Sequence, residues 1–301
     1  MQGILGIYKP QNYTSHDVVA IVRRQSGIKK VGHNGTLDPM ATGVLVICVG
    51  RATRIIEYLE DDCKEYIAAM KLGYRSDTLD IWGNILEESD PCEVDKITYE
   101  DIKRVTKDFK GRITQIPPKY SALKVNGKKL YEYAREGKSV VIKSREVNIR
   151  EFEILDFEHG ELTFRVLCSK GTYIRTICDD IGQRLGVGGV MTALERTKNG
   201  IFKAEETVSI ENIKAMDKDE IKSLLKPVDY PLNMPSLDLS YNEAKDLING
   251  KKVIFSNSDI FSEPKQVRYK IYYKNLFVGV AVYEPQQELL RAEKILNTEI
   301  I

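Results

Sequence analysis

Short apolar segments that alternate with polar ones predict several strands. In KEYIAAMKLG, the residues Tyr66, Ala68, Met70 and Leu72 occupy every second position, which is the pattern of a half-buried strand. A similar alternation before and after the turn dipeptide His159-Gly160 predicts a hairpin. The predicted strands of the first 200 residues are 3–8, 44–49, KEYIAAMKLG, 145–157 and 161–168.

Apolar residues at helical spacing predict helices between these strands. One helix follows a capping box from Thr14 to Asp17, and another follows a box from Thr98 to Asp101. The predicted helices lie in TSHDVVAIVRRQSG, Arg51 to Leu59, TYEDIKRVTKDF and the segment from Thr172 to Leu185. Strands and helices alternate without a regular βαβ rhythm, so we predict an α+β fold with a mixed, largely antiparallel sheet.

The proline-rich stretch KPVDYPLNMP is the most linker-like part of the chain. Beyond it, a short helix from Asn242 to Ile248 and the strand-like segments QVRYKIYYKN and LFVGVAVYEP predict a small β-rich domain. We therefore expect one domain over residues 1–232 and a second over residues 236–301.

The composition argues against several classes of protein. The longest apolar run spans about eight residues, well short of the roughly 18 that cross a bilayer, and the N-terminus lacks a signal-peptide pattern. We therefore expect a cytoplasmic protein with no membrane partner. The five cysteines are odd in number and lack C-x-x-C spacing, which favours reduced thiols. The three histidines are scattered, so we expect no metal site.

Positive charge is concentrated in one segment, although the net charge of the chain is only +1. Residues 119–150 carry nine Lys or Arg against three Glu, a local excess of +6, and the rest of the chain sums to −5. Tyr120, Tyr131 and Tyr133 lie among these cations, a mixture that suits an RNA backbone with exposed bases. A solvated, Lys-rich surface accounts for the charges equally well.

The loop GHNGTLDPMATG is the strongest candidate for chemistry. It is open to four interpretations: a tight turn, a phosphate-binding loop without its G-K-[ST] signature, one half of a carboxylate pair, or a lone carboxylate held rigid. Pro39 favours an extended conformation for Asp38, and the small residues around it leave room for a ligand. An ionised aspartate can act as a nucleophile without a neighbouring base.

A second segment supplies a possible partner for this carboxylate. In CSKGTYIRTICDDIG, Arg175 falls in the first helical turn, where the macrodipole disfavours a cation by about 0.3–1 kcal/mol. Pairing with a carboxylate from another segment would explain its place and would orient that carboxylate. A surface arginine that extends into solvent is the alternative.

Five segments together resemble the bacterial tRNA pseudouridine-55 synthases of the TruB family. The resemblance is strong over residues 1–230 and weaker beyond. It is carried, in this order along the chain, by GIYKPQNYTSHDVV, GHNGTLDPMATGVL, KEYIAAMKLGYRSDTLDIWG, PPKYSALKVNGKKLYEYAREG and CSKGTYIRTICDDIG.

The resemblance implies a pseudouridine synthase fold with a small PUA-like RNA-binding domain at the C-terminus. The implied reaction isomerises uridine 55 in the T stem-loop of tRNA: the base flips out, the C1′–N1 bond breaks and a C1′–C5 bond forms. Such an isomerisation requires no cofactor or metal. The basic segment 119–150 corresponds to the family's RNA clamp, and we expect a monomer.

The resemblance also implies roles for individual residues. Asp38 would be the catalytic aspartate, Arg175 its ion-pair partner, and Tyr66 would stack on the uracil and take part in proton transfer. Attack of Asp38 on C1′, attack on C6 and assistance of elimination all remain open. The implied substrate-binding residues are His33, which would fill the space left by the flipped base, and Tyr173 and Leu194, which would line the pocket.

Two positions depart from the family pattern, and two other functions remain open. Asn12 stands where Gly is usual in K-P-x-G-x-T-S, which would alter a turn, and Asn34 stands where Thr or Ala is common. The alternatives are a guide-RNA-dependent pseudouridine synthase and a tRNA-folding chaperone with incidental catalysis. The compact N-terminus and the clamp segment favour a guide-free enzyme.

Overall fold

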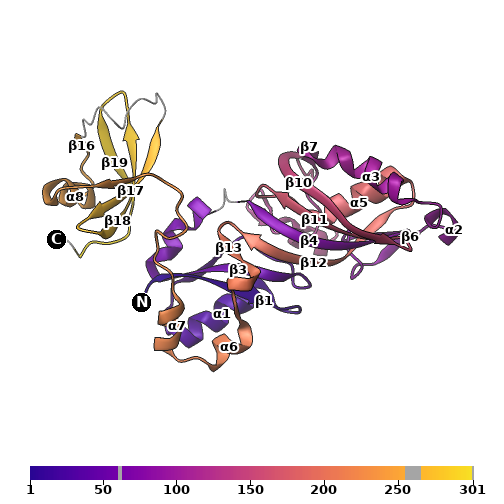
Figure 1. Ribbon diagram of the computed structural model, residues 1–301, viewed down its shortest axis with the longest axis horizontal. Helices are drawn as coiled ribbons and strands as arrows, with labels where there is room; N and C mark the ends of the chain where they lie inside the picture. The colour runs from indigo at the N-terminus through magenta and orange to yellow at the C-terminus, as the bar shows by residue number, and fades with distance from the viewer. Residues whose placement is uncertain (60–62, 255–265, 300–301) are drawn as a thin grey trace.

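The computed structural model describes residues 1–59, 63–254 and 266–299 as two sheets with helices packed on them (Figure 1). The larger sheet has ten strands, with the main order β14-β1-β3-β12-β4-β11-β10-β7; β2 pairs with β3 and β13 with β12. Its strands are β1 (Gly3–Lys9), β2 (Val31–Asn34), β3 (Thr42–Val49), β4 (Lys64–Leu72), β7 (Gly111–Gln115), β10 (Arg145–Glu158), β11 (Glu161–Cys168), β12 (Gly189–Asn199), β13 (Phe202–Lys203) and β14 (Val208–Ser209).

Most neighbours in this sheet are antiparallel, and β1 with β14 and β12 with β3 are parallel. The predicted α+β class with a mixed, largely antiparallel sheet is therefore confirmed. The hairpin around His159-Gly160 is formed by β10 and β11 as predicted. The central strand β12 was not predicted, because GVMTALERTKN has neither a simple alternation nor a continuous apolar run.

The helices agree closely with the sequence pattern. Both predicted capping boxes form, from Thr14 to Asp17 and from Thr98 to Asp101. The segment from Gly50 to Leu59 is helical in the 3₁₀ form, and the helix predicted from Thr172 starts two residues later, so Arg175 stays in its first turn. The α-helices are α1 (Ser15–Ser26), α2 (Pro91–Val94), α3 (Tyr99–Thr106), α4 (Leu130–Arg135), α5 (Ile174–Leu185), α6 (Ile210–Ala215), α7 (Lys218–Leu224) and α8 (Tyr241–Ile248); the shorter 3₁₀ turns are Lys107–Phe109 and Ala204–Glu206.

Two hydrophobic clusters on the large sheet position the segments of interest. One packs α5 and α3 against β4, β11 and β12, and it includes Leu37 and Ala41 from the loop between β2 and β3. The other packs α1, α6 and α7 against β1 and β3. The β2–β3 loop therefore packs on the first cluster, while β2 and β3 at its two ends contribute Val31 and Leu45 to the second.

Two small hairpins extend from this core. The first pairs β5 (Tyr74–Ser76) with β6 (Ile85–Glu88), and the second pairs β8 (Lys124–Val125) with β9 (Lys128–Lys129). The second hairpin and α4 lie within the basic segment 119–150.

The C-terminal sheet has five strands in the order β15-β17-β18-β19-β16, with α8 packed on it. Its strands are β15 (Ser236–Asp238), β16 (Val253–Ile254), β17 (Val267–Tyr273), β18 (Leu276–Glu284) and β19 (Leu289–Ile295). Leu296 connects the C-terminal sheet to residues 50–59. Its side chain joins a hydrophobic cluster with Ile55, and its carbonyl accepts a 2.9 Å hydrogen bond from Arg51.

Candidate active site

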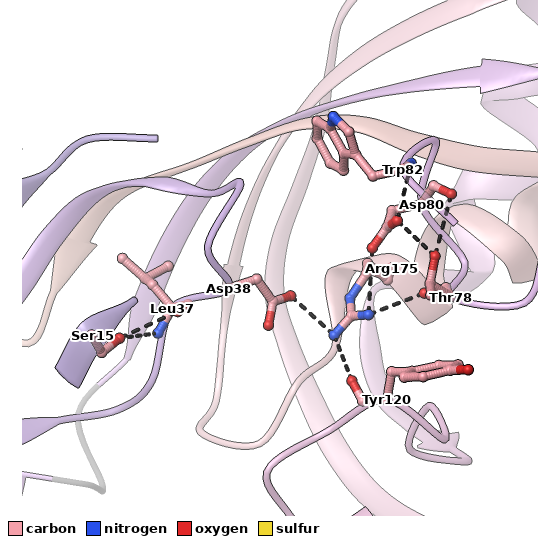
Figure 2. A network of polar contacts seen from close by, with 8 residues as sticks. All are labelled: Ser15, Leu37, Asp38, Thr78, Asp80, Trp82, Tyr120 and Arg175. Carbon is pink, nitrogen blue, oxygen red and sulfur yellow. Dashed lines mark hydrogen bonds and ion pairs between the residues drawn. The ribbon is translucent and has the colours of Figure 1, made fainter. Parts of the chain in front are cut away.

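The loop between β2 and β3 is anchored on both sides of Asp38. The Ser15 hydroxyl, only 2% exposed, accepts a 2.9 Å hydrogen bond from Leu37 N–H and donates one of 3.2 Å to the Leu37 carbonyl (Figure 2). Asn12 N–H donates to the Pro39 carbonyl at 2.9 Å. The backbone groups of both neighbours of Asp38 are thus held by hydrogen bonds, which restricts where the carboxylate can lie.

Lys9 adds a buried cation beneath this loop. Its side chain is fully buried, and Nζ donates to the carbonyls of Pro10, Tyr13 and Pro39 at 2.8, 2.8 and 3.1 Å. Burial lowers the pKa of Lys9 to about 8, and the charge of Asp38 opposes that decrease. Lys9 does not stand out in the sequence, because a lysine at the end of an apolar strand resembles an ordinary surface residue.

Asp38 and Arg175 meet, although they lie on distant segments. Arg175 Nη2 is 3.0 Å from Asp38 Oδ2 (Figure 2). The arginine side chain is 6% exposed, whereas that of Asp38 is 42% exposed. One carboxylate face therefore remains open to a ligand while the other is held by a buried guanidinium, which suits a group that must be both oriented and accessible.

The same guanidinium binds three further acceptors. Nη1 donates to the Thr78 carbonyl at 3.0 Å and lies 3.5 Å from Asp80 Oδ2, and Nη2 donates to the Tyr120 carbonyl at 3.0 Å. Asp80 is itself fixed by the Thr78 hydroxyl, which donates to Oδ1 at 2.7 Å. Asp80 was missed by sequence reasoning, and its only signal was the acidic turn SDTLD next to a predicted strand.

Tyr66 lies on β4, with Arg196 of β12 directly opposite it in the register. It is 8% exposed and shares a hydrophobic cluster with Leu37, Ala41 and Leu194, so it lies beside the loop that carries Asp38. Burial raises the pKa of Tyr66, and the nearby Arg196 opposes that increase. Arg196, fully buried, donates to the carbonyls of Val44 and Gly35 at 2.7 and 3.1 Å and so ties Tyr66 to both ends of the loop.

The two predicted pocket residues differ in their surroundings. Leu194 is 9% exposed and packs in the same cluster as Tyr66. Tyr173 caps α5, and its backbone exchanges two hydrogen bonds with the Gln115 side chain at 3.0 and 3.2 Å. The guanidinium of Arg145 lies 4.8 Å from the centre of the Tyr173 ring, so one face of this ring is occupied.

His33 lies on β2, at the start of the same loop. Burial lowers its pKa to about 4, with further decreases from His16 and Arg196, so the ring is neutral near pH 7. His16, at the first turn of α1, makes an edge-on contact with it at 5.7 Å. In the part of the chain that the structure describes, no hydrogen bond or ion pair joins His33 to Asp38 or Arg175.

The basic segment reaches this centre through the Tyr120 carbonyl. Its other tyrosines are paired with cations: Lys128 lies 5.0 Å from the centre of the Tyr133 ring, and Lys129 lies 5.4 Å from that of Tyr131. The segment therefore presents cations and aromatic rings together, as its composition predicted.

Neither a metal-binding cluster nor a membrane-spanning helix is found among the described residues. Over residues 1–59, 63–254 and 266–299, there is no group of three or more His, Cys, Asp or Glu side chains placed to hold a metal ion. Within the same ranges, no helix is long and apolar enough to cross a membrane.

This chain is similar in sequence to known proteins over almost its whole length. Residues 23–174 match the family described as TruB family pseudouridylate synthase (N terminal domain), and residues 175–233 match the tRNA pseudouridylate synthase B C-terminal domain. A tRNA pseudouridine synthase B of Alkaliphilus oremlandii is 42% identical over 99% of this chain and 98% of its own length. That of Syntrophomonas wolfei is 46% identical over 99% of this chain and 94% of its own length.

Solved structures with the same fold include Cbf5 proteins. In the archaeal box H/ACA sRNP Nop10–Cbf5 complex, the matched chain has a TM-score of 0.70 and 23% identity, over 98% of this chain and 86% of that one. In an H/ACA RNP bound to a substrate RNA that contains 2′-deoxyuridine, the values are 0.70 and 23%, over 98% and 85%.

Proposed function

This chain belongs to the TruB family of pseudouridylate synthases, and we propose that it converts uridine 55 in the T loop of tRNA to pseudouridine. In this isomerisation the C1′–N1 bond breaks and a C1′–C5 bond forms. The hydrogen on C5 must leave, and N1 must gain one, so the atoms of the base are conserved. The chain's likeness to relatives named tRNA pseudouridine synthase B supports tRNA as the substrate.

The pairing of Asp38 with Arg175 is the single observation that carries this proposal. A partly exposed carboxylate, 3.0 Å from a buried guanidinium, can be held in one orientation while a ribose approaches its open face. Asp38 is proposed as the catalytic aspartate on this basis. Arg175 is proposed to hold it in place.

We assign the neighbouring residues supporting roles. Tyr66 lies beside the Asp38 loop, where its ring can stack on a uracil and its hydroxyl can take part in proton transfer. His33, whose ring burial keeps neutral, is suited to fill the space left by a flipped base. Leu194 and Tyr173 are proposed to line the pocket.

The RNA would be held by two further parts of the chain. The segment 119–150 is proposed to clamp the T stem-loop, and its contact with Arg175 through Tyr120 links that clamp to the centre. Residues 236–301 are proposed to form a PUA-like domain that binds another part of the tRNA, with residues 1–232 as the catalytic domain. We further propose that the protein acts as a monomer in the cytoplasm, without a cofactor or metal.

The alternative functions have weaker support. The Cbf5 structures share 23% identity with this chain and establish the fold alone, whereas the relatives with 42–46% identity are named as tRNA enzymes. This difference favours a guide-free enzyme over a guide-RNA-dependent one. A tRNA-folding role is compatible with the same site, and an Asp38→Asn variant separates that role from catalysis.

An Asp38→Asn variant tests the proposal. The amide keeps the size of the side chain but removes its charge, so we expect tRNA binding within about threefold of wild type and no detectable pseudouridine. Mass-spectrometric mapping of an unmodified tRNA transcript, incubated without any guide RNA, measures the product. Turnover by the variant would refute the role of Asp38, and a need for a guide RNA in the wild type would overturn the choice of a guide-free enzyme.

A further inference from the structure

Trp82 lies on the rim of the candidate active site and is the sole tryptophan of the chain. It follows β5 in the turn that carries Asp80, and 41% of its surface is exposed. Single exposed apolar residues are common and need no function by themselves. Trp82 differs from such residues in how it is attached to the catalytic groups.

The backbone of Trp82 is tied to the carboxylate that holds Arg175. Trp82 N–H donates to Asp80 Oδ1 at 3.2 Å, while Asp80 Oδ2 lies 3.5 Å from Arg175 (Figure 2). Arg175 in turn contacts Asp38 at 3.0 Å. In Figure 2 the indole ring extends from this turn toward the side of the view on which Asp38 approaches Arg175.

The turn itself is rigid and strained. Leu79 has a φ of 64°, a left-handed conformation that costs a leucine about 1–2 kcal/mol. Two hydrogen bonds to β12 hold it there, from Met191 N–H to the Leu79 carbonyl at 3.2 Å and from Ile81 N–H to the Met191 carbonyl at 2.9 Å. Strained residues persist only where the surroundings enforce them, and they cluster at ligand sites.

The indole ring of Trp82 is partly exposed. Among the residues that the structure describes, no aromatic ring or cation packs on its face and no acceptor receives a hydrogen bond from its Nε1. By contrast, Tyr131, Tyr133 and Tyr173 each have a cation over the ring. An exposed indole beside a site where a base is proposed to flip out suits a nucleobase, because base–aromatic stacking depends on an open ring face.

We propose that Trp82 is a stacking platform for a loop base of the substrate RNA, adjacent to the uridine that reacts at Asp38. The proposal rests on the proposed function for the identity of the ligand as RNA and for the place of the reacting uridine at Asp38. No covalent step involves Trp82, so its contribution is to affinity and to placement of the loop.

Fluorescence offers a direct test, because Trp82 is the only tryptophan. Stacking on a base should quench its emission when an unmodified tRNA transcript saturates the wild-type protein, with saturation measured independently by filter binding. Trp82→Phe should show no tryptophan signal and should bind tRNA within about threefold of wild type. Unchanged emission at saturation would overturn the proposal.

Affinity supplies the second measurement. We expect Trp82→Ala to raise the Kd and the KM for tRNA by about 5- to 150-fold, the equivalent of about 1–3 kcal/mol, with kcat nearly unchanged. Tyr99→Ala is the matched control, since Tyr99 is a similarly exposed ring (49%) on α3 and has none of the contacts of the Asp80 turn. An unchanged Kd for Trp82→Ala, or a loss confined to kcat, would overturn the stacking role.

These results are separable from the proposed function. A wild-type protein that binds tRNA with quenched emission but forms no pseudouridine would refute the reaction and support the stacking platform. A wild-type protein that forms pseudouridine with unchanged emission, and a Trp82→Ala variant with unchanged Kd, would refute the platform alone.

Discussion

Replacing Arg175 with lysine would keep the positive charge but remove the guanidinium fork that joins four acceptors. Nη1 binds the Thr78 carbonyl and Asp80, and Nη2 binds the Tyr120 carbonyl and Asp38. A lysine has a single nitrogen, which can satisfy one of these two pairs at best. At least two hydrogen bonds to a charged donor are therefore lost.

The size of the effect follows from this count. Each hydrogen bond to a charged group contributes about 1.5–3 kcal/mol, so losing two gives about 3–6 kcal/mol, of which water and side-chain relaxation can recover part. We expect the free energy of unfolding to fall by about 2–4 kcal/mol. If the bond to Asp38 is among those lost, the rate should fall about 10- to 150-fold, because about 1.36 kcal/mol corresponds to tenfold.

Single-turnover pseudouridine formation and urea unfolding measure the two effects separately. Arg165→Lys is the matched control, because Arg165 also binds several carboxylates, Glu65, Glu151 and Glu153, at 2.8–2.9 Å. Side chains alternate between the two faces of a strand, and the neighbours of Arg165 on β11, Phe164 and Val166, are buried. Arg165 therefore points to the face of the sheet opposite to theirs. We expect its rate to match wild type. A rate for Arg175→Lys within about threefold of wild type would refute the role of the ion pair.

Two further changes test the surroundings of the loop. Asn12 has a φ of 66°, in the left-handed region. We therefore expect Asn12→Gly to change the free energy of unfolding by less than about 0.5 kcal/mol and Asn12→Val to lower it by about 1–2 kcal/mol. Equal stabilities of the two variants in urea would contradict this. The folded-state pKa of His33 is lowered to about 4 from 6.5, so the unfolded chain binds more protons between these values. The contribution of His33 to the free energy of unfolding is therefore present above pH 6.5 and lost as the pH falls toward 4. His33→Gln should remove about 1–2 kcal/mol of this pH dependence of stability. Identical curves of unfolding free energy against pH for the variant and the wild type would exclude this role of His33.

Asn12 shows how a departure from the family pattern becomes intelligible in the structure. Its left-handed backbone is the conformation that glycine adopts most easily and that asparagine tolerates better than other residues. The Asn12 N–H donates to the Pro39 carbonyl, so the turn that the substitution affects is in contact with the Asp38 loop. The sequence identified the position, and the structure supplied its connection to the site.

The local elements of this protein were predictable from its sequence. The capping boxes at Thr14 and Thr98, the alternation in β4 and the hairpin turn at His159-Gly160 depend on residues a few positions apart, so their patterns identify them directly. The motif around Asp38 was identified for the same reason, since its small residues and its proline are contiguous.

Only the tertiary structure decided which distant groups converge on Asp38. The pairing with Arg175 was anticipated as a requirement, but Asp80 and Lys9 were not, because each reaches the site through contacts between segments far apart in sequence. Trp82 was not anticipated either, because its own hydrogen bond is to the neighbouring Asp80, and only the contact of Asp80 with Arg175 brings that turn to the site. Those contacts depend on the strand order, in which β12 lies between β3 and β4 and brings their loops together. Local patterns carry no information on strand order, because it is set by how whole elements bury their apolar faces.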